Sequence, residues 1–138
     1  MRVSRIMQRQ PSCVGPGTSI RAAAALMKDR DIGFLPVVEG GVAIGVLTDR
    51  DLVLGLMPNA RWGRDQPVST IMTRYVSICH ADHSVVDAAR MMGDRRIRRL
   101  LVNDPDGRLL GIVSLGDIAR DASEELAGQT LGEIVECR

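Results

Sequence analysis

The chain has 138 residues, of which 45% are hydrophobic and 25% charged, a composition typical of globular proteins. A formal net charge of +1 and an aromatic content of 2% argue against a nucleic-acid partner or an anionic membrane. No apolar run approaches the roughly 20 residues that span a bilayer, so we expect a cytoplasmic protein. Cys13, Cys79 and Cys137 follow no spacing pattern, which disfavours a disulfide framework.

The sequence contains one unit twice. Val3-Ser-Arg-Ile-Met7 returns as Val68-Ser-Thr-Ile-Met72, an offset of 65 residues (68 minus 3). After one inserted residue the offset becomes 66, which aligns Gly45 with Gly111 (111 minus 45). A unit of this size buries too little surface to be stable alone. The repeat therefore predicts two halves packed as one module, with a functional site between the copies.

The first copy shows local signals for two helices and a hairpin. Ser19 precedes apolar residues at helical spacing, and Gly40-Gly41 separates two apolar runs as a tight hairpin turn does. The expected elements are a short helix (4–9), a short strand (12–14), a turn (15–17), a helix from residue 20, strands 34–39 and 42–47, and helix 49–56.

The second copy has the same order. Ser84 and Asp87 have capping-box spacing before a helix, and strands 99–103 and 109–113 lead into helix 115–125. The order predicts an α+β fold made of two β-α-β-β-α units related by a pseudo-two-fold axis. The expected boundaries are repeat one at 1–57, a linker at 58–67, repeat two at 68–125, and a C-terminal tail or short helix at 126–138.

Each copy carries one pattern that suits ligand binding. Gly45-Val-Leu-Thr48 with Asp51, and Gly111-Ile-Val-Ser114 with Asp117, both read glycine, two apolar residues, a hydroxyl and, three residues later, an aspartate. A glycine permits close approach of a ligand to the strand, and a hydroxyl at a helix N-terminus can bind an anion. A carboxylate one turn further can accept two hydrogen bonds from the vicinal hydroxyls of a ribose.

The same spacing has a purely structural interpretation. A Thr or Ser followed three residues later by an acid is also a capping box, which stabilises the start of a helix without any ligand. Duplication copies caps as readily as sites. Capping alone and capping combined with ligand binding both remain open.

Taken together, these motifs resemble those of a tandem CBS-domain pair, or Bateman module, over about residues 3–120. The resemblance is carried by Ile6-Met7 and Ile71-Met72, by the strands 32–38 and 97–102, and by the two glycine–hydroxyl–aspartate segments. As a pair with no attached enzyme or channel, the chain is most similar to the bacterial stress- and hypoxia-response type.

The resemblance implies a regulatory protein, and because no nucleophile, base and orienting group occur together at usable spacing, we do not expect an enzyme. Such pairs commonly form homodimers and bind adenosine-containing ligands between the repeats. AMP, ADP or ATP is the expected ligand here, with NAD or S-adenosylmethionine less favoured and no required cofactor. By match to the family, Asp51 and Asp117 would bind ribose, and Thr48 and Ser114 ribose or phosphate.

The resemblance also predicts two unequal sites. Arg98 and Arg99 match positions that reach phosphate, which would assemble one site from Thr48, Asp51 and both arginines, with adenine near Val14 and Ile32. The equivalents in repeat one, Gly33 and Phe34, carry no charge, so the Asp117 cleft would lack its cation. Alternatively, both arginines lie on a solvent-exposed face and have no role in ligand binding. Leu101 replaces the proline seen at Pro36, which suggests altered strand geometry.

Other functions have weaker signals. Cys79-His-Ala-Asp-His83 is faintly metal-like, but no second cluster completes a four-ligand site, so loop and capping roles are expected. Cys79 is expected to be a buried small residue. Besides the ligand sensor, two alternatives stay open: a scaffold or interaction protein with vestigial clefts, and, remotely, a metal or redox sensor. A ligand sensor of this kind is also expected to have a protein partner that receives the signal.

Overall fold

The structure is a computed structural model that describes residues 1–57 and 65–136, and most of the predicted linker lies outside them. The chain divides into two compact units. Unit 1 comprises Met1–Pro11 and Ser77–Arg138, and unit 2 comprises Ser12–Val76. The first residues of the chain therefore pack with the second repeat, so each unit combines parts of both sequence repeats.

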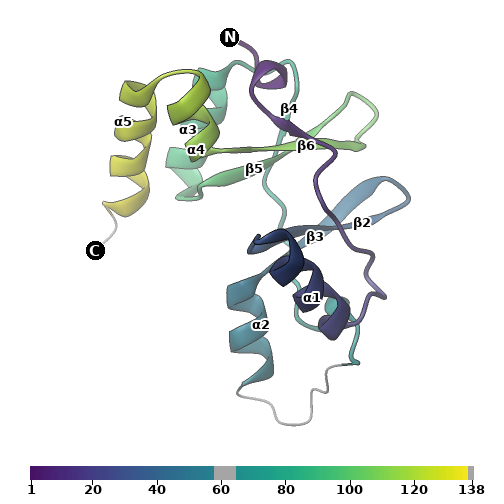
Figure 1. Cartoon of the computed structure of the whole chain (residues 1–138). Helices are drawn as coiled ribbons and strands as arrows, with labels where there is room; N and C mark the ends of the chain where they lie inside the picture. The colour runs from purple at the N-terminus through teal and green to yellow at the C-terminus, as the bar shows by residue number, and fades with distance from the viewer. Residues whose placement is uncertain (58–64, 137–138) are drawn as a thin grey trace. The chain divides into compact units, whose positions relative to one another are not determined.

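Unit 1 is built on a four-stranded sheet with the order β1-β6-β5-β4 (Figure 1). Its strands are β1 (Gln8–Arg9), β4 (Ile78–His80), β5 (Arg99–Asn103) and β6 (Leu109–Ser114). Strand β6 is antiparallel to both of its neighbours, and β4 runs parallel to β5. The predicted strands of the second copy are thus confirmed to within one residue.

Unit 2 repeats this arrangement, but single β-bridges take the place of its two edge strands. Strands β2 (Phe34–Glu39) and β3 (Val42–Thr48) form an antiparallel hairpin. Both turn glycines, Gly40 and Gly41, have positive φ values of 61° and 81°, which is the turn that the sequence predicts. A parallel bridge from Val14 to Val37 and an antiparallel bridge from Val46 to Thr73 stand where unit 1 has β4 and β1. The predicted strand at 12–14 is therefore reduced to a single bridge.

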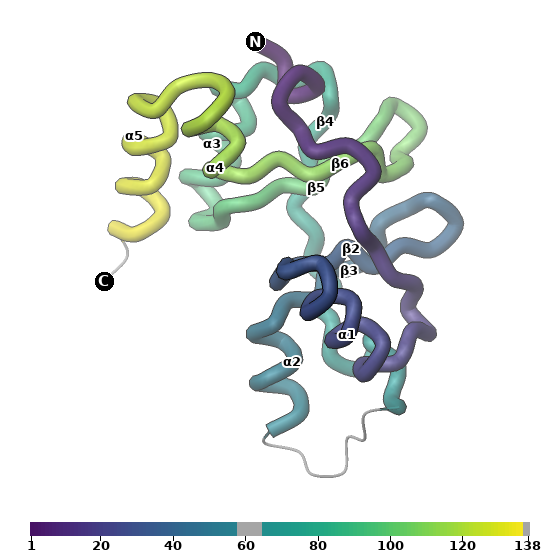
Figure 2. Tube along the Cα trace, viewed as in Figure 1, coloured from purple at the N-terminus to yellow at the C-terminus, as the bar shows by residue number. Residues whose placement is uncertain are grey.

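The predicted helix at 4–9 is wrong. Val3–Arg5 forms a single 3-10 turn, and the chain then extends as β1 beside β6 (Figure 2). The extended form is possible because the residue opposite Arg9 is Gly111. A Cβ at Gly111 would collide with the carbonyl oxygen of Gln8. Tertiary pairing thus overrides the local helical preference.

Four helices confirm the predicted repeat. They are α1 (Ile20–Arg30), α2 (Asp49–Leu56), α3 (Val85–Arg95) and α4 (Leu115–Asp121). The hydroxyl oxygens of Ser19 and Ser84 accept the backbone N–H groups of Ala22 and Asp87, each at the start of its helix. At Ser84 the predicted capping box is half formed, because the Asp87 carboxylate pairs instead with Arg90, at 3.4 Å.

The predicted helix at 115–125 is two helices. Helix α4 ends at Asp121, and a 12-residue helix, α5 (Glu124–Val135), follows where the sequence suggested a tail or short helix. Ser123 begins α5 by accepting the N–H of Leu126 at 3.1 Å, and two glutamates occupy its first turn, where the helix dipole favours negative charge. Helix α5 packs against α3 and α4 (Figure 1).

Each unit has its own apolar core, built from aliphatic side chains and methionines. The helix faces predicted to be buried are confirmed except at Ala24, which is half-buried. The buried members are Ile20, Ala23 and Met27 in α1 and Val85, Ala88, Ala89 and Met92 in α3. The replacement of Pro36 by Leu101 leaves the strand register alike, because both hairpins have an irregularity at the equivalent step, Val37/Val38 and Val102/Asn103. Within the described residues, no helix combines the length and apolarity that a bilayer crossing requires.

Gly111→Ala should destabilise the protein by about 1–3 kcal/mol, the usual cost of overpacking, because the new methyl group would displace β1 from β6. Gly132→Ala in α5 is the control, since its added Cβ would have no neighbour within 4 Å. That change should instead stabilise by about 0.5–1 kcal/mol, the helix preference of alanine over glycine. Urea unfolding measures both variants, and equal stability of the two would contradict the close packing of β1 on β6.

Cys79 in β4 is fully buried, and loss of solvation raises the pKa of its thiol from 9.0 to about 11. In the unfolded chain the thiol ionises near its ordinary pKa, so ionisation favours unfolding. The contribution of the buried thiol is fully present below about pH 9 and is lost by about pH 11, amounting to roughly 2–3 kcal/mol. The difference in unfolding free energy between the wild type and Cys79→Ala should shrink across this range, whereas a constant difference would contradict the shifted pKa.

Candidate functional site

Thr48 and Asp51 form a reciprocal pair where β3 gives way to α2. The backbone N–H of Asp51 donates to Thr48 Oγ1 at 3.0 Å, and the backbone N–H of Thr48 donates to Asp51 Oδ2 at 2.9 Å. Both residues are half-buried. This is a complete capping box, so the structural interpretation of the motif holds for this copy.

Ser114 and Asp117 repeat the geometry where β6 gives way to α4. The backbone N–H of Asp117 donates to Ser114 Oγ at 3.1 Å, and that of Ser114 donates to Asp117 Oδ2 at 2.8 Å. In each copy, therefore, one carboxylate oxygen is used by the cap. Oδ1 of each carboxylate takes no part in the cap.

The two Oδ1 atoms differ in their surroundings. Asp51 Oδ1 accepts the hydroxyl of Thr73 at 3.3 Å, a long contact from an exposed side chain. Asp117 Oδ1 accepts Nη2 of Arg120 at 2.6 Å and Nε2 of Gln8 at 3.3 Å, and the Asp117 side chain is 2% exposed. The Asp51 carboxylate is thus the more accessible of the two.

The glycines of the motif serve the protein chain rather than a ligand. The sequence suggested that Gly45 and Gly111 leave room for a bound molecule beside the strand. In the structure, a Cβ on Gly45 would lie 2.9 Å from the carbonyl oxygen of Thr73. Gly111 likewise faces the backbone of Gln8. These glycines therefore admit the segments that carry Thr73 and Gln8, which is a correction to the expected role.

Arg98 and Arg99 are exposed and lie in unit 1, next to Ser114. Strand pairing sets Arg99 opposite Ser114, and the carbonyl oxygen of Arg98 accepts the N–H of Leu115 at 2.8 Å. Sequence reasoning assigned the arginines to the Asp51 site and missed this proximity, although the hairpin register could have revealed it. The grouping of both arginines with Thr48 and Asp51, which belong to unit 2, stays a prediction.

A cavity of about 520 Å³ opens beside these arginines. Small and apolar residues of α4 and α5 form much of its wall, and Glu124 adds one carboxylate. Its lining residues are Arg98, Arg99, Ser114, Leu115, Gly116, Ala119, Glu124, Ala127, Gly128 and Leu131. Asp117 is not among them, because its carboxylate is turned to Gln8 and Arg120. Helix α5 supplies four of the lining residues, and the sequence, which suggests a tail or short helix only from residue 126, does not predict its start at Glu124.

The expected adenine contacts, Val14 and Ile32, both lie in unit 2. Each is half-buried and packs against that unit's apolar core. Val14 is fixed by hydrogen bonds to both sides of its bridge: its N–H donates to Pro36 and its carbonyl accepts from Val38. The two residues thus belong to the same unit and the same core, and their role as adenine contacts stays a prediction.

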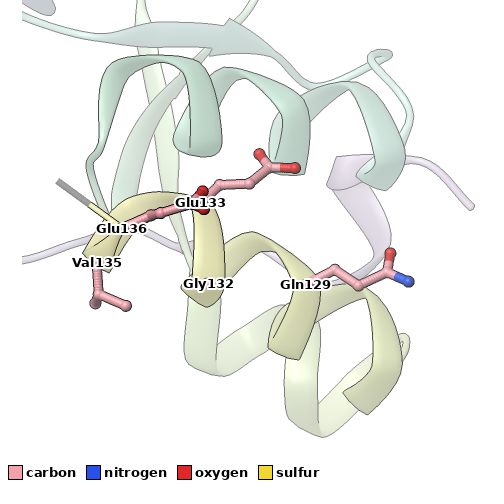
Figure 3. Close-up of a pocket in the computed structure, with 5 residues that line it drawn as sticks. All are labelled: Gln129, Gly132, Glu133, Val135 and Glu136. Carbon is pink, nitrogen blue, oxygen red and sulfur yellow. The ribbon is translucent and has the colours of Figure 1, made fainter.

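The remaining candidates show structural roles. His83 Nδ1 accepts the backbone N–H of His80 at 3.2 Å, a local loop contact. Across the described residues, no group of three or more His, Cys, Asp or Glu side chains could hold a metal ion. A hollow of about 470 Å³ along the end of α5 is lined by Gln129, Gly132, Glu133, Val135 and Glu136 (Figure 3). Its two carboxylates make it unsuited to a phosphate.

Comparison with known proteins places these features in a family. The CBS domain family matches residues 3–57 and 68–124. The chain is 41% identical over 133 residues to the CBS domain-containing protein YhcV of Bacillus subtilis, covering 96% of this chain and 94% of the relative. It is 35% identical over 125 residues to hypoxic response protein 1 of Mycobacterium tuberculosis, covering 86% and 83%.

Solved structures of CBS proteins have the same fold as this chain. CBSX2 in complex with AMP matches with a TM-score of 0.78 and 28% identity, covering 90% of this chain and 97% of that one. The CBS domain pair of MJ0100, in complex with 5-methylthioadenosine and S-adenosyl-L-methionine, matches with a TM-score of 0.77 and 29% identity, covering 91% and 98%. The repeated sequence, the repeated unit architecture and these likenesses show that the chain belongs to the CBS domain family, as a tandem pair.

Proposed function

We propose that this CBS pair is a non-catalytic regulatory protein that binds an adenine nucleotide, with AMP, ADP or ATP favoured over NAD or S-adenosylmethionine. Asp51 accepts the ribose hydroxyls and Thr48 contacts ribose or phosphate. Arg98 and Arg99 reach the phosphate, and Val14 and Ile32 contact the adenine. Ser114 and Asp117 are the weaker counterpart site. The protein acts in the cytoplasm as a homodimer.

The hydrogen bonds of the Asp51 carboxylate are the main support for this proposal. Its Oδ2 is fixed by the cap, which holds the carboxylate in one orientation without a ligand. Its Oδ1 keeps a long contact to an exposed hydroxyl, which a ribose hydroxyl can replace at little cost. Capping and binding thus use different oxygens of one carboxylate. The complexes of CBSX2 with AMP and of MJ0100 with two adenosine compounds support the ligand class.

Regulation follows if the nucleotide prefers one arrangement of the protein over another. A ligand shifts such an equilibrium only by its difference in affinity for the two states. We propose that nucleotide binding changes the arrangement of the pair and that a protein partner responds to this change. A scaffold with vestigial clefts is the second candidate, because complete capping boxes give Thr48, Asp51, Ser114 and Asp117 a sufficient role without any ligand.

Asp51→Ala should weaken nucleotide binding more than Asp117→Ala does. A thermal-shift screen with AMP, ADP, ATP, NAD and S-adenosylmethionine tests this. A ligand at one hundred times its Kd adds about 2.7 kcal/mol, or several degrees of Tm. Both substitutions remove a capping carboxylate, so each should lower the Tm without ligand, and the ligand-induced shift is the informative quantity. Equal losses of the shift would contradict the assignment to Asp51. No shift with any ligand would favour the scaffold.

Replacing both arginines, Arg98→Gln with Arg99→Gln, should weaken AMP binding by roughly tenfold to a hundredfold, the value of one or two charged hydrogen bonds. The affinity for adenosine, which has no phosphate, should stay unchanged. Isothermal titration with the two ligands measures the contrast. Parallel weakening of AMP and adenosine would show that the arginines act on the fold, and unchanged AMP affinity would remove them from the site.

A further inference from the structure

The two aspartates have equivalent neighbours of different chemistry. The offset of 65 aligns Gln8 with Thr73 (73 minus 8), and the offset of 66 aligns Leu54 with Arg120 (120 minus 54). Gln8 and Thr73 each contact the aspartate of their own unit. Residues 54 and 120 each stand three positions after that aspartate, on the same helix. The two carboxylates therefore occupy matching positions and differ in the side chains at these two neighbouring positions.

At Asp117 these neighbours are strong donors. Arg120 makes a charge-assisted bond of 2.6 Å to Oδ1, and Gln8 adds a second donor at 3.3 Å. Arg120 Nε also lies 3.5 Å from Asp121 Oδ2, a second carboxylate contact that helps to orient the guanidinium. With Oδ2 used by the cap and the side chain 2% exposed, both oxygens of the carboxylate are bonded to groups of its own chain.

At Asp51 the equivalent positions provide only one weak hydrogen-bond donor to the carboxylate. Leu54 has no hydrogen-bond donor in its side chain, and it is 56% exposed. Thr73 offers one hydroxyl, at 3.3 Å from Oδ1 and 3.5 Å from Oδ2. A ligand that donates two hydroxyls can replace this contact, whereas at Asp117 it must displace a cation from a buried anion.

We propose that Arg120 and Gln8 determine the number of ligand sites, by occupying the Asp117 carboxylate so that each chain binds one vicinal-diol ligand, at Asp51. This inference rests on the proposed function. It adds a cause of inequality that is separate from the arginines at 98 and 99. Arg120 bonds the Asp117 oxygen that a ribose hydroxyl would otherwise contact. Leu54, at the equivalent position, cannot bond Asp51 and leaves its carboxylate accessible to a ligand.

The test counts AMP molecules bound per full-length chain by isothermal titration. The wild type should bind one. The double variant Arg120→Leu with Gln8→Thr copies the neighbours of Asp51 onto Asp117 and should bind two, and adding Asp117→Asn should remove the second. Arg120→Lys, which keeps the charge, should remain at one. A double variant that is folded by circular dichroism and still binds one AMP overturns the proposal, as does a wild type that binds two.

The reciprocal change is Leu54→Arg, which places a guanidinium one turn after Asp51. It should weaken AMP binding at Asp51 by at least tenfold, and unchanged affinity overturns the proposal. Arg90→Leu is the matched control, because Arg90 also follows a helix-start aspartate, Asp87, by three residues. Both side chains of that pair are more than half exposed, so its removal should change neither number nor affinity of sites.

The outcomes separate this inference from the proposed function. If the wild type binds no AMP but the double variant gains one site that Asp117→Asn removes, the blocking role of Arg120 and Gln8 is supported and the assignment to Asp51 fails. If the wild type binds one AMP that Asp51→Ala abolishes, and the double variant gains none, the proposed function stands and this inference fails. No binding of AMP by any variant overturns this inference, and the proposed function fails as well if ADP, ATP, NAD and S-adenosylmethionine also do not bind.

Discussion

The close backbone contact at two glycines organises both units. At Gly111 and Gly45 the absence of a side chain lets the opening segment of one repeat lie against a strand of the other repeat. This contact makes the first 11 residues part of unit 1 and closes unit 2 with residues up to Val76. It also brings Gln8 and Thr73 to the two aspartates. The exchange of segments therefore sets the chemistry of the sites as well as the fold.

A capping box and a ribose acceptor are compatible roles for one residue. In both copies the cap uses Oδ2 and leaves Oδ1 to be satisfied by something else. At Asp117 the chain itself provides the partner, and at Asp51 it provides a weak one. A carboxylate already oriented by the helix start loses little freedom when it binds a ligand, which favours affinity. In the proposed function, helix stability and ribose binding therefore draw on the same local geometry at Asp51.

The sequence predicts the repeat, the order of the main strands and helices, the Gly40-Gly41 turn and the helix caps at Ser19 and Ser84. Each of these rests on local signals or on the offset between the two copies. It does not predict that residues 8–9 form a strand, because the partner strand lies about 100 residues away in the chain. It also misses the length of α5, although Ser123 with two glutamates was a readable start signal. The engagement of Asp117 by Gln8 depends on this long-range pairing, so spacing alone could not reveal it.

The central claim is that one carboxylate of the pair is open to a nucleotide and the other is closed by its own chain. A crystal structure of the full chain grown with AMP tests it most directly. We expect a ribose whose hydroxyls contact Asp51 Oδ1, while Arg120 remains on Asp117. A nucleotide at Asp117 with Arg120 displaced, or a nucleotide bound without any contact to Asp51, would contradict it.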